Sequence, residues 1–161
     1  MAVQVGRAGD DFSDWTGLLK LLHEAFAYME KRIDPPSSLH QLTPESIADK
    51  ARAETLFLAT DGRELVGCVF ALHKRDALYV GKLAVRTSRQ GNGVGRRLMN
   101  AAEELARESG LEYLELSTRI ELVENHAAFS AMGFVKTAET SHQGYDRPTS
   151  ITMRKRLARA G

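Results

Sequence analysis

Residues 82–98 read KLAVRTSRQGNGVGRRL and form the most informative segment of the chain. The apolar run before Arg86 predicts the end of a strand, and apolar residues recur at helical spacing from Val94 onward. Three glycines stand between them at alternate positions, 91, 93 and 95. Glycine lets a backbone approach a ligand closely, and the first N–H groups of a helix carry the positive end of its dipole. The stretch therefore predicts a phosphate-binding loop that opens a helix.

The residues around these glycines discriminate among phosphate-binding motifs. A P-loop requires Lys followed by Ser or Thr after its last glycine, whereas Gly95 is followed by two arginines. The dinucleotide fingerprint would put Arg96 at a position that needs a tiny residue, although Glu115 follows at about the twenty-residue spacing of its acidic partner. Two alternative interpretations of the glycine segment therefore remain. One is the loop of an NAD-dependent enzyme, which the pattern supports weakly, and the other is a turn that binds no ligand.

The rest of the chain predicts strands and helices on both sides of this loop. The expected strands are 2–8, 55–60, 64–74, 77–85, 111–117, 134–140 and 150–156, and the expected helices are 12–30, 43–52, 94–109 and 125–132. Asp61-Gly62 marks a hairpin, and Thr43-Pro44 marks a helix start. One β-α-β crossover joins 77–85 to 111–117, so we expect an α/β fold with helices on the faces of one mixed sheet.

Composition excludes several classes of function. The chain has 161 residues, enough for one domain, and 43% of them are apolar. A formal net charge of +1 offers no bulk attraction to nucleic acid or to an anionic membrane. The N-terminus has no apolar signal region and no stretch has the length of a membrane span, so we expect a cytoplasmic protein. The lone Cys68 lies in an apolar run and is expected in the core, and five scattered histidines predict no metal site.

Two segments resemble signatures of the GNAT superfamily of N-acetyltransferases. Gln90-x-x-Gly93-x-Gly95 resembles its pyrophosphate loop, and residues 124–134 resemble its second signature, an asparagine and an aromatic on a short helix before Gly-Phe. The order of segments also matches, so the resemblance covers nearly the whole chain. It implies a mixed, mostly antiparallel sheet of about seven strands with four helices, in which the central parallel pair is splayed for coenzyme A. Residues 1–161 would form a single acyl-CoA N-acyltransferase domain.

The resemblance also implies an activity and the residues that hold the donor. The chain would transfer acetyl from acetyl-CoA to a primary amine of a small molecule or a protein, by direct attack in a ternary complex. A non-catalytic acyl-CoA-binding module is the alternative. The implied coenzyme-binding residues are Leu83, Ala84, Val85, Gln90, Gly91, Asn92, Gly93, Val94, Gly95, Arg96, Asn125 and Phe129. Backbone groups of residues 83–85 would pair with the pantetheine arm, and amides of residues 90–96 would hold the diphosphate.

One residue departs from the family pattern. Many members carry a tyrosine at the aromatic position of the second signature, and Phe129 has no proton to give to a departing thiolate. Tyr79 and Tyr145 are the candidate catalytic substitutes. A thiol pKa near 8.5 also makes the thiolate a fair leaving group without an acid.

The acceptor is implied to enter from the side opposite the coenzyme. The candidate residues there are Glu24, Tyr28, Asp34, His142 and Asp146, and we expect Tyr28 and Asp34 to contact the substrate. Carboxylates would suit a cationic amine. The resemblance is also compatible with a homodimer. Neither the amine nor the preferred acyl length follows from the sequence.

Overall fold

The computed structural model describes residues 2–158, which form a seven-stranded sheet in the order β1-β2-β3-β4-β5-β7-β6. The strands are β1 Val3–Arg7, β2 Thr55–Asp61, β3 Glu64–His73, β4 Ala77–Val85, β5 Tyr113–Arg119, β6 Val135–Thr140 and β7 Ser150–Arg156. The α-helices are α1 Trp15–Phe26, α2 Pro44–Ala53, α3 Val94–Glu108 and α4 Val123–Ala131. Every pair of neighbouring strands is antiparallel except β4 and β5. The predicted fold class is therefore confirmed.

The ends of several elements differ from the predicted ones for local reasons. The first helix ends at Phe26 and continues as a 3-10 turn to Met29. Strand β5 begins two residues late, because the Leu111 N–H still bonds to the Ala106 carbonyl and closes α3. Helix α4 begins at Val123 instead of residue 125, because the Leu122 carbonyl accepts the first helical hydrogen bonds.

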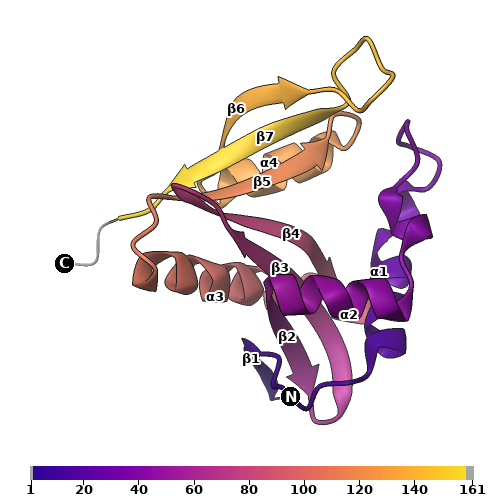
Figure 1. Ribbon diagram of the computed structural model, residues 1–161, viewed down its shortest axis with the longest axis vertical. Coiled ribbons are helices and arrows are strands. Elements are labelled where there is room, and N and C mark those ends of the chain that lie inside the picture. Colours follow the sequence, from indigo (N-terminus) through magenta and orange to yellow (C-terminus); the bar gives the residue numbers. More distant parts are fainter. Residues whose placement is uncertain (1, 159–161) are drawn as a thin grey trace.

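Apolar side chains pack on both faces of the sheet. Leu98 and Ala102 of α3 pack with Leu78 of β4 on one face, and the C-terminal strands and Phe129 of α4 join the same cluster. Leu18 and Leu22 of α1 pack on the opposite face, together with residues of α2. Figure 1 shows α3 on one side of β2, β3 and β4 and α1 and α2 on the other, with β5, β7 and β6 angled away from β4.

The two parallel strands are hydrogen-bonded at one end only. The β4–β5 register covers three pairs and stops at Tyr79 opposite Glu115. Further along, the β3–β4 register shifts at a bulge, and Lys82 in that bulge has φ +52°. A bulge bends and twists a strand, and a positive φ in a residue other than glycine costs roughly 1–2 kcal/mol. The bulged strand thus leaves its parallel neighbour, which confirms the predicted splay.

Within residues 2–158, none of the helices has the length and apolar character needed to cross a lipid bilayer.

Candidate active site

A cavity of about 700 Å³ fills the opening between β4 and β5. Its walls come from both faces of the sheet. Met99, Asn125 and Phe129 line it on the side of α3 and α4. On the side of α1 it is lined by Phe26, Tyr28 and Leu39. The cavity therefore passes through the sheet and can hold two reactants that approach from opposite sides.

The glycine loop leaves the start of α3 open at one mouth of this cavity. Gly93 is the N-cap residue with φ +80°, Gly91 has φ +84°, and no side chain caps the helix. A Cβ added at either glycine would meet nothing within 4 Å. The space beside both glycines is therefore empty, and no side chain occupies the N–H groups at the start of α3, as binding of a diphosphate at a helix N-terminus requires.

Ion pairs anchor the segment that leads into this loop. Arg89 pairs with Asp61 at 2.9 Å and with Glu64 at 3.3 Å, so two arms of the β2–β3 hairpin hold it. The Gln90 Nε2 atom donates to the Val85 carbonyl at 3.1 Å, which ties the loop to the end of β4. Sequence reasoning missed the two ion pairs of Arg89 because their partners lie on a hairpin distant in the chain.

Arg96 and Arg97, which follow the last glycine, differ in their contacts. The Arg97 guanidinium donates to the Val3 carbonyl of β1 at 2.7 Å, so it turns away from the loop. Arg96 is exposed at the start of α3. Of the two, Arg96 is the one that leaves its positive charge free beside the glycine loop.

The structure brings most of the coenzyme residues implied by the sequence to one place. Six of them line the cavity together: Leu83, Ala84, Val85, Gln90, Asn125 and Phe129. The others, residues 91–96, form the loop and the first turn of α3 beside it. Donor contacts would therefore run continuously from the helix start into the split between the strands.

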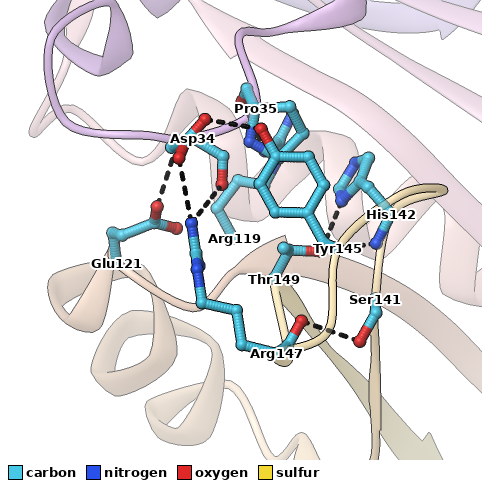
Figure 2. A network of polar contacts seen from close by, with 9 residues as sticks. All are labelled: Asp34, Pro35, Arg119, Glu121, Ser141, His142, Tyr145, Arg147 and Thr149. Atoms are coloured by element: carbon cyan, nitrogen blue, oxygen red, sulfur yellow. Dashed lines mark hydrogen bonds and ion pairs between the residues drawn. The ribbon is translucent and has the colours of Figure 1, made fainter.

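The segment after α1 is tied to the C-terminal half of the sheet. The Tyr145 hydroxyl donates to an Asp34 carboxylate oxygen at 2.6 Å, and Arg147 pairs with Asp34 at 3.1 Å (Figure 2). The hydrogen bond to Asp34 raises the pKa of Tyr145. Arg119 donates to the carbonyls of Pro35 and Pro36 at 2.7 and 3.2 Å. These contacts hold the segment as a wall across one side of the opening.

A second pair of contacts joins this segment to α4. Arg32 forms two hydrogen bonds with Glu124, and they lower the pKa of Glu124 to about 2. The Asn125 side-chain amide donates to the Tyr28 hydroxyl at 3.1 Å. Tyr28 lines the cavity, whereas Asp34 is engaged by Tyr145 and Arg147 outside the lining.

The two tyrosines named from the sequence as proton donors lie outside the described cavity lining. Tyr79 sits at the last paired position of β4, with the Lys74 ammonium 4.4 Å from its ring centroid. Tyr145 lies on the β6–β7 connection, and its hydroxyl donates a hydrogen bond to Asp34. Phe129 does line the cavity, and its ring packs edge-on against Phe134 at 6.0 Å.

His142 is the cavity residue best suited to accept a proton at neutral pH. Its imidazole lines the cavity, while its Nδ1 contacts the hydroxyl of the buried Thr149. Burial and the nearby Arg119 charge lower the pKa of His142, against a smaller opposing effect of Glu121. The imidazole is therefore neutral at pH 7, a state in which one ring nitrogen accepts a proton.

Cys68 is confirmed as a core residue: it has no exposed surface, and burial raises the pKa of its thiol to about 12. Because the thiolate is the reactive form, we expect a disulfide reagent at pH 8 to label Cys68 at least about 100-fold more slowly in the native protein than in denaturant. Absorbance of the released thiol chromophore measures both rates. Equal rates would contradict the buried position.

Among residues 2–158, no group of three or more His, Cys, Asp or Glu side chains is arranged to hold a metal ion.

A helix start open to phosphate lies beside a split parallel pair, which is the arrangement that the resemblance implied for an acyl-CoA-dependent transferase. The chain belongs to the acetyltransferase (GNAT) family, whose profile matches residues 15–134. It is thus an acetyl-CoA-dependent N-acetyltransferase, as the sequence predicted. Membership in this family favours an N-acetyltransferase over the two alternatives, an NAD-dependent enzyme and a non-catalytic acyl-CoA-binding module.

Individual relatives agree with this assignment. The chain is 35% identical over 127 residues to the aminoglycoside N(6')-acetyltransferase type 1 of Stenotrophomonas maltophilia, covering 71% of this chain and 82% of that one. The fold matches PaiA N-acetyltransferase from Thermoplasma acidophilum, solved with coenzyme A, with TM-score 0.81, 12% identity and coverage of 98% and 100%. It also matches a GNAT acetyltransferase from Elizabethkingia anophelis with acetyl-CoA bound, with TM-score 0.69, 17% identity and coverage of 96% and 98%.

Proposed function

We propose that this enzyme transfers the acetyl group of acetyl-CoA to a primary amine by direct attack while both substrates are bound. The observation that carries the proposal is the cavity that runs through the split sheet. A donor held at the glycine loop would extend its thioester into the opening from the side of α3, and an amine would meet it from the side of α1. The buried Cys68 thiol does not line this cavity, so the proposal includes no acetyl group on Cys68.

The proposal assigns the donor to the glycine loop and to residues that line the cavity. Amides of residues 90–96 would hold the diphosphate, and backbone groups of Leu83, Ala84 and Val85 would pair with the pantetheine arm. Asn125 would contact the arm and Phe129 would pack against it. A free N–H near Val85 would stabilise the oxyanion of the tetrahedral intermediate.

Proton transfers complete the proposed reaction. A primary amine has a pKa of about 10 and must lose a proton before it attacks the thioester carbonyl. His142 is the base that we assign to this step, directly or through a water molecule. The C–S bond then breaks, the sulfur leaves with the electron pair, and the nitrogen loses its second proton, so that an amide, coenzyme A thiol and one proton are formed.

The test is release of free thiol from acetyl-CoA with a panel of amines: simple alkylamines, amino acids, an aminoglycoside and a lysine-containing peptide. The aminoglycoside is included because of the acceptor named for the Stenotrophomonas relative. We expect amine-dependent thiol release, and mass spectrometry should find one acetyl group on the amine. Tight binding of acetyl-CoA without release by any amine would contradict the proposal.

A further inference from the structure

Lys82 and Arg119 line the cavity, and neither has the carboxylate partner that the other half-buried lysines and arginines of residues 2–158 have. Among residues 2–158, each lysine or arginine without a carboxylate oxygen within 4.0 Å is exposed, apart from Lys82 and Arg119. Both are half-buried, and both line the cavity. Half-buried charges are normally paired, so two unpaired ones in one cavity indicate an anion supplied by a ligand.

Lys82 reaches the cavity from the bulge of β4, on the face that carries α1 and α2. Its neighbours there are Lys50 and Glu54, which pair with each other at 2.6 Å, so the surroundings leave one positive charge in excess. Burial and the Lys50 charge lower the pKa of Lys82. Within the described part of the chain the Lys82 ammonium makes no hydrogen bond or ion pair, and all three of its donors are available.

Arg119 lies on β5, across the opening from Lys82. Its two terminal nitrogens bond to neutral carbonyls of the segment after α1. These carbonyls fix the orientation of the guanidinium without neutralising it. Glu121 and Asp34 act on Arg119 only at longer range, beyond ion-pair distance. The side of the cavity that faces α1 therefore presents positive charge from both flanking strands.

Among the carboxylates near this mouth, Glu124 and Asp34 have arginine partners. Glu121 accepts from the Asp34 backbone N–H at 2.9 Å and has no cation within 4.0 Å. Glu124, the acidic residue in the described lining, is bonded by Arg32. Asp34 is paired with Arg147 at 3.1 Å. A polycationic acceptor would find few free carboxylates here and would face Lys82 and Arg119.

We propose that the acceptor of this enzyme carries a carboxylate beside its primary amine, and that Lys82, with Arg119, binds that carboxylate. The inference rests on the proposed function and narrows it to a substrate class. Apolar side chains share the same wall, namely Ala25, Phe26, Met29 and Leu39. They suit an apolar body, so an amino acid with an aliphatic or aromatic side chain fits best.

The experiment compares acceptors that differ only in the carboxylate. L-leucine, L-leucinamide and isopentylamine share one alkyl body, and kanamycin serves as the polycationic acceptor. The wild-type enzyme and its variants are assayed for kcat/KM with each amine at saturating acetyl-CoA. The ratio of leucine to leucinamide within one protein, compared between proteins, cancels the intrinsic difference in amine reactivity.

Lys82→Met removes the charge and keeps the length of the side chain. We expect the leucine-to-leucinamide ratio to fall by about ten- to hundredfold, the effect of one charge-assisted hydrogen bond, while KM for acetyl-CoA stays unchanged. Lys82→Arg should retain much of the ratio. Lys20→Met is the matched control, because Lys20 is exposed on α1 and unpaired outside the cavity lining. It should leave the ratio unaltered.

Each other outcome overturns the inference. A ratio that is the same in wild type and Lys82→Met shows that Lys82 does not bind the carboxylate. Turnover of isopentylamine or kanamycin, but of no amine with a carboxylate, excludes amino acids as the acceptor class. Failure of the proposed function itself is recognised separately, as acetyl-CoA binding by calorimetry without thiol release from any of the four acceptors.

Discussion

Gly93→Asp is expected to raise the dissociation constant for acetyl-CoA at least about 100-fold and to abolish measurable turnover. Gly93 is the N-cap residue of α3, and the space beside it is empty. A carboxylate there would accept hydrogen bonds from the helix N–H groups and would stand within a few ångströms of the diphosphate. Two like charges 4 Å apart at a partly solvated surface repel by about 4 kcal/mol, more than the 2.7 kcal/mol of a 100-fold change. Isothermal titration calorimetry with coenzyme A measures the loss.

The φ of +80° at Gly93 means that part of any effect comes from backbone strain. Gly62 provides the matched control, because it has φ +61° in the β2–β3 hairpin and also has nothing within 4 Å of an added Cβ. Gly62→Asp introduces the same side chain at a similar backbone conformation, away from the cavity. It should bind coenzyme A as wild type does. Equal weakening in both variants would mean that strain, and not the phosphate cradle, controls binding.

The parts of the fold that were predicted from the sequence are those encoded by neighbouring residues. The glycines before Val94 are a local signal for the start of α3, and this signal does not depend on residues distant in the chain. Thr43 and Ser46 cap α2 reciprocally, an interaction within one turn. Strand β4 was predicted with its observed ends because a turn and a glycine loop bound it. Local signals of this kind survive folding when tertiary contacts do not oppose them.

The features of the site that were not predicted depend on pairs far apart in the chain. Arg32 and Glu124 are 92 residues apart, and Arg147 and Asp34 are 113 residues apart. Neither residue of such a pair signals the other. The φ of +52° at Lys82 is likewise set by a bulge against β3, and lysine has no local preference for it. The charge of the cavity wall on the side of α1 could therefore not be predicted from the sequence.

Glu115, at the hydrogen-bonded end of β4 and β5, is expected to contribute strongly to the free energy of unfolding. It is 7% exposed, and it accepts hydrogen bonds from Lys74 at 2.9 Å and Arg154 at 2.8 Å. Arg154 also pairs with Asp76 at 3.1 Å. Removing one member of a buried ion pair costs about 3–5 kcal/mol, and the partial exposure of both cations reduces this. We expect Glu115→Ala to lower the free energy of unfolding by about 2–3 kcal/mol, measured by urea denaturation.

The pH dependence of this loss distinguishes a charge effect from lost packing. Burial opposes ionisation of Glu115, but the hydrogen bonds from Lys74 and Arg154 outweigh it and lower its pKa below the ordinary 4.5. A carboxyl whose pKa is lower in the folded protein than in the unfolded chain stabilises the fold at pH values above its pKa in the unfolded chain. This stabilisation is lost as the pH falls through its pKa in the folded protein. The difference between wild type and Glu115→Ala should therefore be full at pH 7 and shrink below about pH 4.

Two further comparisons complete this test. Glu139→Ala removes an exposed pair with Lys136 on the edge strand β6 and should change stability little at any pH. A difference between wild type and Glu115→Ala that does not vary with pH would show that packing, and not charge, holds this end together. Glu115 lies opposite Tyr79 at the last paired position, so the strands part directly beyond it. If the ion cluster fixes that point, Glu115→Ala should also weaken acetyl-CoA binding, because the opening would no longer begin at one defined residue.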